Sequence, residues 1–128
     1  MPLHWIIDSR DKLITITAGG DVSYGNVTEC LDALVGAQAL GYRKLVDCAA
    51  AIFRMNRAEL AALSFKVREL HGTGAMGAAA FILNIETSAP EVQLLGAIAA
   101  ADRPLRLFKT QAQAKRWIDD LMPKRSTR

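Results

Sequence analysis

Hydrophobic and polar residues alternate strictly near the start of the chain. Residues 3–8 (LHWIID) and 13–18 (LITITA) show the two-residue period of strands with one buried face. Because a short polar connection, residues 9–12, joins them, the two runs predict a β-hairpin. Gly19 and Gly20 follow directly and predict a break or bulge in the second strand.

The pattern then changes to alternating helices and strands. Apolar residues from Val27 onward recur at helical spacing, with Asn26 as a candidate N-cap and Gly41 as the stop. Residues 43–49 predict a short strand. Asn56 followed three positions later by Glu59 has the spacing of a capping box, so a second helix is expected from there to residues 71–72.

Two further strand–helix units complete the chain. Residues 78–85 are apolar in both alternating sets, which is typical of a central strand covered on both faces. A helix is expected over residues 91–101 and a last strand over 105–109. Thr110 is the expected N-cap of a final helix, which Pro123 closes.

The order of elements, β-β-α-β-α-β-α-β-α, predicts an α/β fold. We expect a mixed, mostly parallel five-stranded sheet with an N-terminal β-hairpin and four helices, because strands alternating with helices favour parallel pairing. Residues 1–122 would form one domain, followed by a basic tail at 123–128. No apolar run approaches the roughly 20 residues that a bilayer requires. Since no secretory signal is recognisable either, we expect a cytoplasmic protein.

The net charge of +3 is unevenly distributed. Residues 1–102 contain eight Lys/Arg and eleven Asp/Glu, whereas residues 103–128 contain eight Lys/Arg and two Asp. A basic end can attract phosphates or an acidic protein surface, but a solvated helix face with a frayed tail has the same composition. Because no row of base-stacking aromatic residues accompanies it, nucleic-acid binding is not expected.

The glycine-rich segment 72–77 (GTGAMG) matches the GxGxxG letters of dinucleotide-binding loops. Such a site needs a strand before the glycines and a helix after them, and this segment has the reverse context. We therefore interpret Gly72 as a helix C-cap followed by a turn, and we expect no cofactor.

Other catalytic or metal-binding groups are sparse. Cys30 and Cys48 are far apart and lack CxxC or histidine neighbours, so small buried thiols are expected rather than a disulfide or zinc site. His71 falls at a helix end. Asp47 ends a strand, where it is either a functional carboxylate or a cap for the following backbone amides. We predict neither catalytic residues nor a metal site.

The segment 91–101 is apolar almost all round. Helices of this kind are normally enclosed. Leu94, Leu95 and Ile98 would therefore meet a second subunit or line a pocket for an apolar small molecule. The alternative is that its alanines are small enough to be harmless on a surface.

The predicted order of elements resembles that of the STAS superfamily, in particular its SpoIIAA-like branch. Four segments of the sequence are the closest to that family. They are residues 44–48 (KLVDC), 78–83 (AAAFIL), 102–108 (DRPLRLF) and 112–118 (AQAKRWI). The resemblance spans most of the chain. It implies a non-enzymatic module that works through the N-terminus of its second helix.

In anti-sigma-factor antagonists of that superfamily, this place carries an Asp-Ser pair whose serine is phosphorylated. Asn56 and Arg57 stand there in this chain, and Ser64 lies more than a turn further on. We therefore expect a cytoplasmic regulatory or protein-interaction module that phosphorylation does not switch. Its partner is another protein or a second copy, and its expected partner-binding residues are Phe53, Arg54, Asn56 and Arg57. The alternative is a carrier or sensor of an apolar small molecule such as a lipid.

Overall fold

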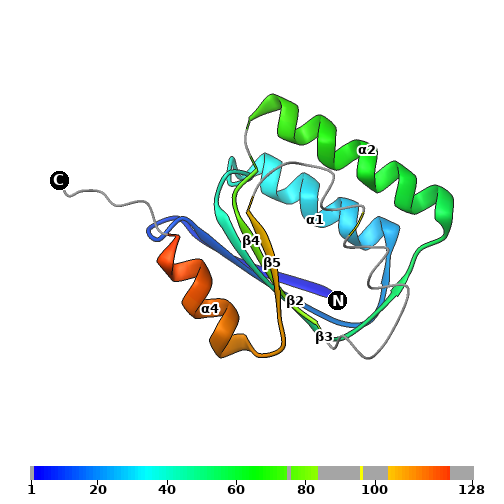
Figure 1. Cartoon of the computed structure of the whole chain (residues 1–128). Coiled ribbons are helices and arrows are strands. Elements are labelled where there is room, and N and C mark those ends of the chain that lie inside the picture. The colour runs from blue at the N-terminus through cyan, green and yellow to red at the C-terminus, as the bar shows by residue number, and fades with distance from the viewer. Residues whose placement is uncertain (1, 75, 84–95, 97–103, 122–128) are drawn as a thin grey trace.

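A five-stranded mixed sheet forms the centre of the molecule (Figure 1). The structure is a computed structural model that describes residues 2–74, 76–83, 96 and 104–121. The strands lie in the order β1-β2-β3-β4-β5, with β1 antiparallel to β2 and every other pair parallel, as predicted. Their bounds are Leu3–Asp8 (β1), Leu13–Ser23 (β2), Arg43–Arg54 (β3), Ala79–Ile82 (β4) and Leu105–Phe108 (β5).

The helices cover the sheet from both sides. Helices α1 (Tyr24–Gly36) and α2 (Arg57–Thr73) lie on one side, and α4 (Gln111–Asp120) lies on the other (Figure 1). The described residues thus contain three helices, not the predicted four. Of the predicted helix 91–101, the structure describes Gly96, which is helical and exposed, whereas Leu94, Leu95 and Ile98 lie outside the described residues.

Helix α1 begins three residues before the predicted position. Its N-cap is Ser23, whose Oγ accepts a hydrogen bond from the Asn26 amide at 3.2 Å, while Asn26 Oδ1 accepts one from the Ser23 amide at 2.9 Å. Asn26 is therefore the reciprocal member of a capping box rather than the cap. The helix ends at Gly36, before the predicted stop at Gly41.

Strands β2 and β3 are longer than their sequence patterns indicate. The pairing register shifts between Thr17 and Gly19, which confirms the predicted irregularity, and Gly20 has φ 68°. The strand nevertheless continues to Ser23, because Gly19–Ser23 pair in parallel with Ala50–Arg54 of β3. Three consecutive alanines, residues 49–51, carry no alternating pattern, so this extension was not visible in the sequence.

Two apolar clusters pack on opposite faces of the sheet. The larger joins the sheet to α1 and α2 and includes the fully buried Ile14, Leu34 and Leu63. The smaller lies under α4 and includes Leu45 and the fully buried Ile118. Each fully buried aliphatic side chain contributes about 1.5–3 kcal/mol relative to an exposed one.

Membrane-spanning helices need both length and a continuous apolar surface. In the described part of the chain, no helix is both long enough and apolar enough to cross a bilayer.

Candidate functional site

The start of α2 brings two basic side chains to the surface around a defined helix cap. Asn56 Oδ1 accepts a hydrogen bond from the Glu59 amide at 2.8 Å, and Glu59 Oε1 accepts one from the Asn56 amide at 3.0 Å. The predicted capping box is thus confirmed. It positions Arg57 as the first helical residue, three positions after β3 ends at Arg54.

The surroundings of this cap are exposed and of mixed charge. Arg54 Nε lies 3.2 Å from Asp21 Oδ1, and both side chains are about two-thirds exposed, so this ion pair contributes at most about 1 kcal/mol. Asn56 and Arg57 are exposed as well. A guanidinium group offers several N–H donors in a planar fork, which suits carboxylates on a partner. The arrangement can therefore hold an acidic group.

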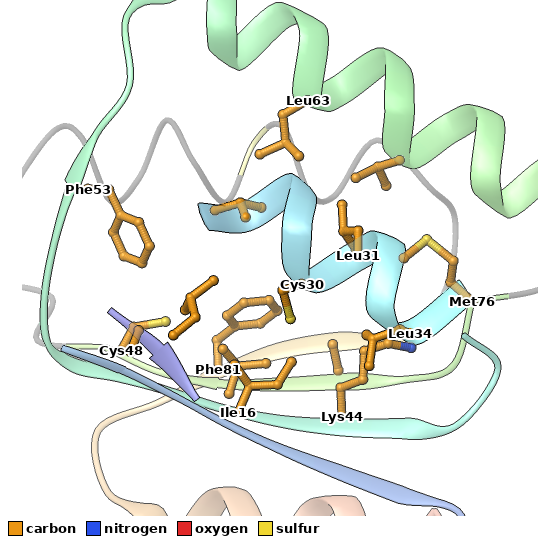
Figure 2. Close-up of a pocket in the computed structure, with 16 residues that line it drawn as sticks. Ile16, Cys30, Leu31, Leu34, Lys44, Cys48, Phe53, Leu63, Met76 and Phe81 are labelled. Carbon is orange, nitrogen blue, oxygen red and sulfur yellow. The ribbon is translucent and has the colours of Figure 1, made fainter. Parts of the chain in front are cut away.

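Phe53 does not belong to this surface. It is only 7% exposed, and its ring lies inside the molecule (Figure 2). Because side chains alternate along a strand, β3 directs Phe53 inward and its neighbours Ile52 and Arg54 outward. The expected partner-binding set is therefore reduced at the surface to Arg54, Asn56 and Arg57.

A cavity of about 90 Å³ lies between the sheet and helices α1 and α2 (Figure 2). Its walls come from strands β1 to β4, both helices and the segment before β4, and all lining side chains but one are uncharged. The lining residues are Leu3, Ile16, Ala18, Val27, Cys30, Leu31, Leu34, Lys44, Val46, Cys48, Phe53, Leu63, Val67, Met76, Ala79 and Phe81.

Lys44 is the charged residue in this wall and is 4% exposed. Its Nζ donates hydrogen bonds to the carbonyl oxygens of Leu40, at 2.5 Å, and Tyr42, at 3.0 Å. These bonds offset much of the cost of burying an ammonium group. Burial raises the pKa of the nearby Cys30 thiol to about 11, while the positive charge of Lys44 acts in the opposite direction. The thiol is therefore protonated at neutral pH.

Asp47 and His71 are not brought together. Asp47 Oδ1 accepts a hydrogen bond from the Ala49 amide at 3.1 Å, as the backbone-capping alternative predicts. His71 Nδ1 accepts one from the Met76 amide at 3.2 Å. Because alternate residues of a strand share a face, Asp47 lies on the same side of the sheet as Leu45, the side that α4 covers. His71 belongs to α2, which lies on the other side. Across the described ranges, no group of three or more His, Cys, Asp or Glu side chains could hold a metal ion.

The glycine-rich segment begins in the last turn of α2 and precedes β4, which is the expected order of helix and strand. The C-cap is Gly74, however, and not Gly72, which is still helical. Gly77 has a separate role, since a Cβ atom there would lie within 2.5 Å of the Gly41 carbonyl oxygen and closer still to that of Tyr42. The glycine permits close backbone approach beside β4, a requirement that the sequence did not reveal.

Arg43 is a second buried basic residue that sequence reasoning missed. Its guanidinium donates to the carbonyl oxygens of Ile118, at 2.7 Å, and Asp11, at 2.6 Å. It thereby ties the last turn of α4 to the β1–β2 hairpin. A basic residue at the start of a predicted strand gives no sign of such burial, because its acceptors are backbone groups far away in sequence.

No protein-family model and no curated protein sequence matches the chain. Several solved structures share its fold, and two of them are described below. An uncharacterised protein of the DUF3478 family from Shewanella loihica PV-4, with a SpoIIAA-like fold, matches with a TM-score of 0.57 at 18% identity over 91% of each chain. The anti-sigma factor antagonist SpoIIAA in its unphosphorylated form matches with a TM-score of 0.56 at 13% identity, over 91% of this chain and 96% of that one. The chain therefore has a SpoIIAA-like fold, as the sequence resemblance implied.

Proposed function

We propose that this protein is a non-enzymatic regulatory module that binds another protein through the start of α2. The observation that carries the proposal is the exposed pair Arg54 and Arg57 beside the Asn56 cap, at an end of the sheet where a helix begins. One similar structure is that of an anti-sigma factor antagonist, a regulator of another protein, which supports the same class of function.

The residues at the start of α2 also favour a module whose binding to its partner is not controlled by phosphorylation. Arg57 has no hydroxyl group, and the nearest serine of the helix, Ser64, lies seven positions further along. Ser64 is half-buried, so a phosphate there would have to be accommodated against neighbouring side chains. The two buried cysteines form no disulfide, which fits a reducing compartment, and we place the protein in the cytoplasm.

The test first identifies partners of the full chain in cells and then compares the affinities of variants for them. Proteins cross-linked to the wild type in cells are identified by mass spectrometry, and the affinity of each purified candidate is then measured by calorimetry. Arg54→Ala combined with Arg57→Ala is expected to weaken binding at least about tenfold, because each hydrogen bond between a guanidinium and a partner carboxylate is worth about 1.5–3 kcal/mol.

The matched control is Arg68→Ala, which removes an exposed arginine further along the same helix. It is expected to leave the affinity unchanged. Equal affinities of the double variant, the control and the wild type would contradict the proposal, because they would place the interface elsewhere.

The cavity favours a second function, a carrier or sensor of an apolar small molecule. Its wall is almost entirely apolar, and such cavities stay free of water and accept apolar guests. Its volume of about 90 Å³ is below that of the roughly 150 Å³ engineered cavity that takes benzene. The cavity as described therefore fits the end of an alkyl chain rather than a whole lipid.

Native mass spectrometry of protein purified from cells tests this alternative. A bound mass that denaturation releases, together with a rise in melting temperature when the same compound is added back, is expected of a carrier. An unliganded mass with no thermal shift across a panel of fatty acids and lipids would end the idea, and it would leave the partner-binding proposal untouched.

A further inference from the structure

Strand β1 lies at an end of the sheet that the described residues form. It pairs with β2, and in the described part of the chain no strand lies against its other side. The Gly19 amide donates to the Pro2 carbonyl oxygen at 2.9 Å, and the register continues from there to Asp8 opposite Leu13. In an antiparallel ladder, residues that bond to the partner alternate with residues that do not. The backbone groups of Leu3, Trp5 and Ile7 therefore point away from β2.

This edge lacks the features that usually prevent further pairing. Between Leu3 and Ile7 there is no lysine, arginine or proline, and the β1–β2 register has no bulge. Ile6 is 61% exposed on the side of the sheet where α4 lies. An open edge that also carries an exposed apolar side chain is a template for another strand.

We propose that β1 pairs in antiparallel orientation with β1 of a second copy, about a two-fold axis at Trp5. In this register Leu3 faces Ile7 of the second copy, and Trp5 faces its own equivalent. All three outward residues of each copy then bond, which gives about six backbone hydrogen bonds. The two sheets become one continuous ten-stranded sheet.

The side chains of β1 match this register on both faces of the sheet. Leu3, Trp5 and Ile7 belong to the apolar cluster under α1, so pairing extends that cluster across the axis. On the opposite face Ile6 lies beside His4 of the second copy, which covers the exposed isoleucine.

The charge pattern and the bond count favour this register and this occupant. Asp8 falls beyond the bonded residues, so no two like charges meet. Registers shifted by two residues leave outward backbone groups unbonded. Because β1 is complementary to itself about Trp5, the occupant is a second copy rather than an unrelated strand.

The paired edge is separate from the proposed partner surface. Strand β1 lies along Leu13–Ala18 of β2, whereas Arg54 lies beside Ser23 at the other end of β2. A failure of the dimer would therefore leave the function proposed for α2 standing, and the reverse also holds.

Sedimentation velocity of the full chain over a range of concentrations tests the pairing. Ile6→Lys keeps its charge solvated in the monomer but places two ammonium groups at the shared edge of the dimer. We expect it to raise the dimer dissociation constant at least about tenfold. Leu107→Lys, at a 40% exposed position on the end strand β5, is the matched control and should dimerise like the wild type. A monomeric wild type, or equal dimerisation of both variants, would overturn the proposal.

Cross-linking tests the register itself. Combining His4→Cys with Ile6→Cys places new thiols opposite each other in pairs without backbone bonds, where Cα atoms are about 4.5 Å apart, a separation that a disulfide spans. Mild oxidation should give a covalent dimer from the double variant, and little from His4→Cys alone. If the double variant stays uncross-linked, or cross-links no better than the single one, the Trp5-centred register is wrong.

Discussion

Gly77 occupies a place where two backbone segments meet with no room for a side chain. A methyl group there would overlap the carbonyl oxygens of Gly41 and Tyr42, which are backbone atoms and cannot rotate away. We expect Gly77→Ala to lower the free energy of unfolding by at least about 2 kcal/mol, as measured by urea denaturation. Gly72→Ala is the control, because a Cβ atom there meets nothing within 4 Å and alanine favours a helix. A decrease of similar size in both variants would show that the close approach is not the cause.

Ionisation of the Cys30 thiol makes the free energy of unfolding depend on pH in the alkaline range. Burial raises its pKa from 9.0 to about 11, so the unfolded chain loses this proton at lower pH than the folded chain does. The protonated thiol therefore makes its full contribution to the free energy of unfolding below about pH 9. This contribution is lost as the pH rises toward 11. We expect the free energy of unfolding to fall more steeply with pH in the wild type than in Cys30→Ala. Parallel pH profiles for the two proteins would contradict this assignment.

The capping box stabilises the start of helix α2. Its effect on stability can be measured separately from the effect of the proposed partner-binding residue Arg57. Asn56→Ala removes the acceptor of the Glu59 amide and should lower the free energy of unfolding by about 1 kcal/mol. Arg57→Ala leaves both bonds of the box in place and should change stability by less than about 0.5 kcal/mol. Urea denaturation of the two variants checks this difference. Equal decreases would show that the capping box does not hold the start of the helix.

The cavity lies on one face of the sheet, and two adjacent alanines of β4 report on the two faces separately. Ala79 lines the cavity under α1 and α2, whereas Ala80 packs in the cluster under α4, and both are fully buried. Ala79→Val should fill part of the cavity and raise the free energy of unfolding by about 1 kcal/mol. Ala80→Val should lower it by about 1–3 kcal/mol, because Ala80 is fully buried and does not line the cavity, so the added atoms must displace its neighbours. Both positions lie in the same strand, so a loss of stability in both variants would show that the cavity is filled in solution.

Local chemistry explains what the sequence alone determined about this protein. The period of apolar residues and the capping residues Asn56 and Thr110 act within a few positions of the chain, so they predicted the order of elements. The resemblance of that order to the SpoIIAA-like branch then implied the fold. The tertiary structure decided whatever depends on distant segments. It extended β2 and β3 through their mutual pairing, turned Phe53 inward, and opened a cavity where helices and sheet do not fully interdigitate. It also left the outer edge of β1 unpaired within the described residues, because an edge is a property of strand order and not of any strand's own residues.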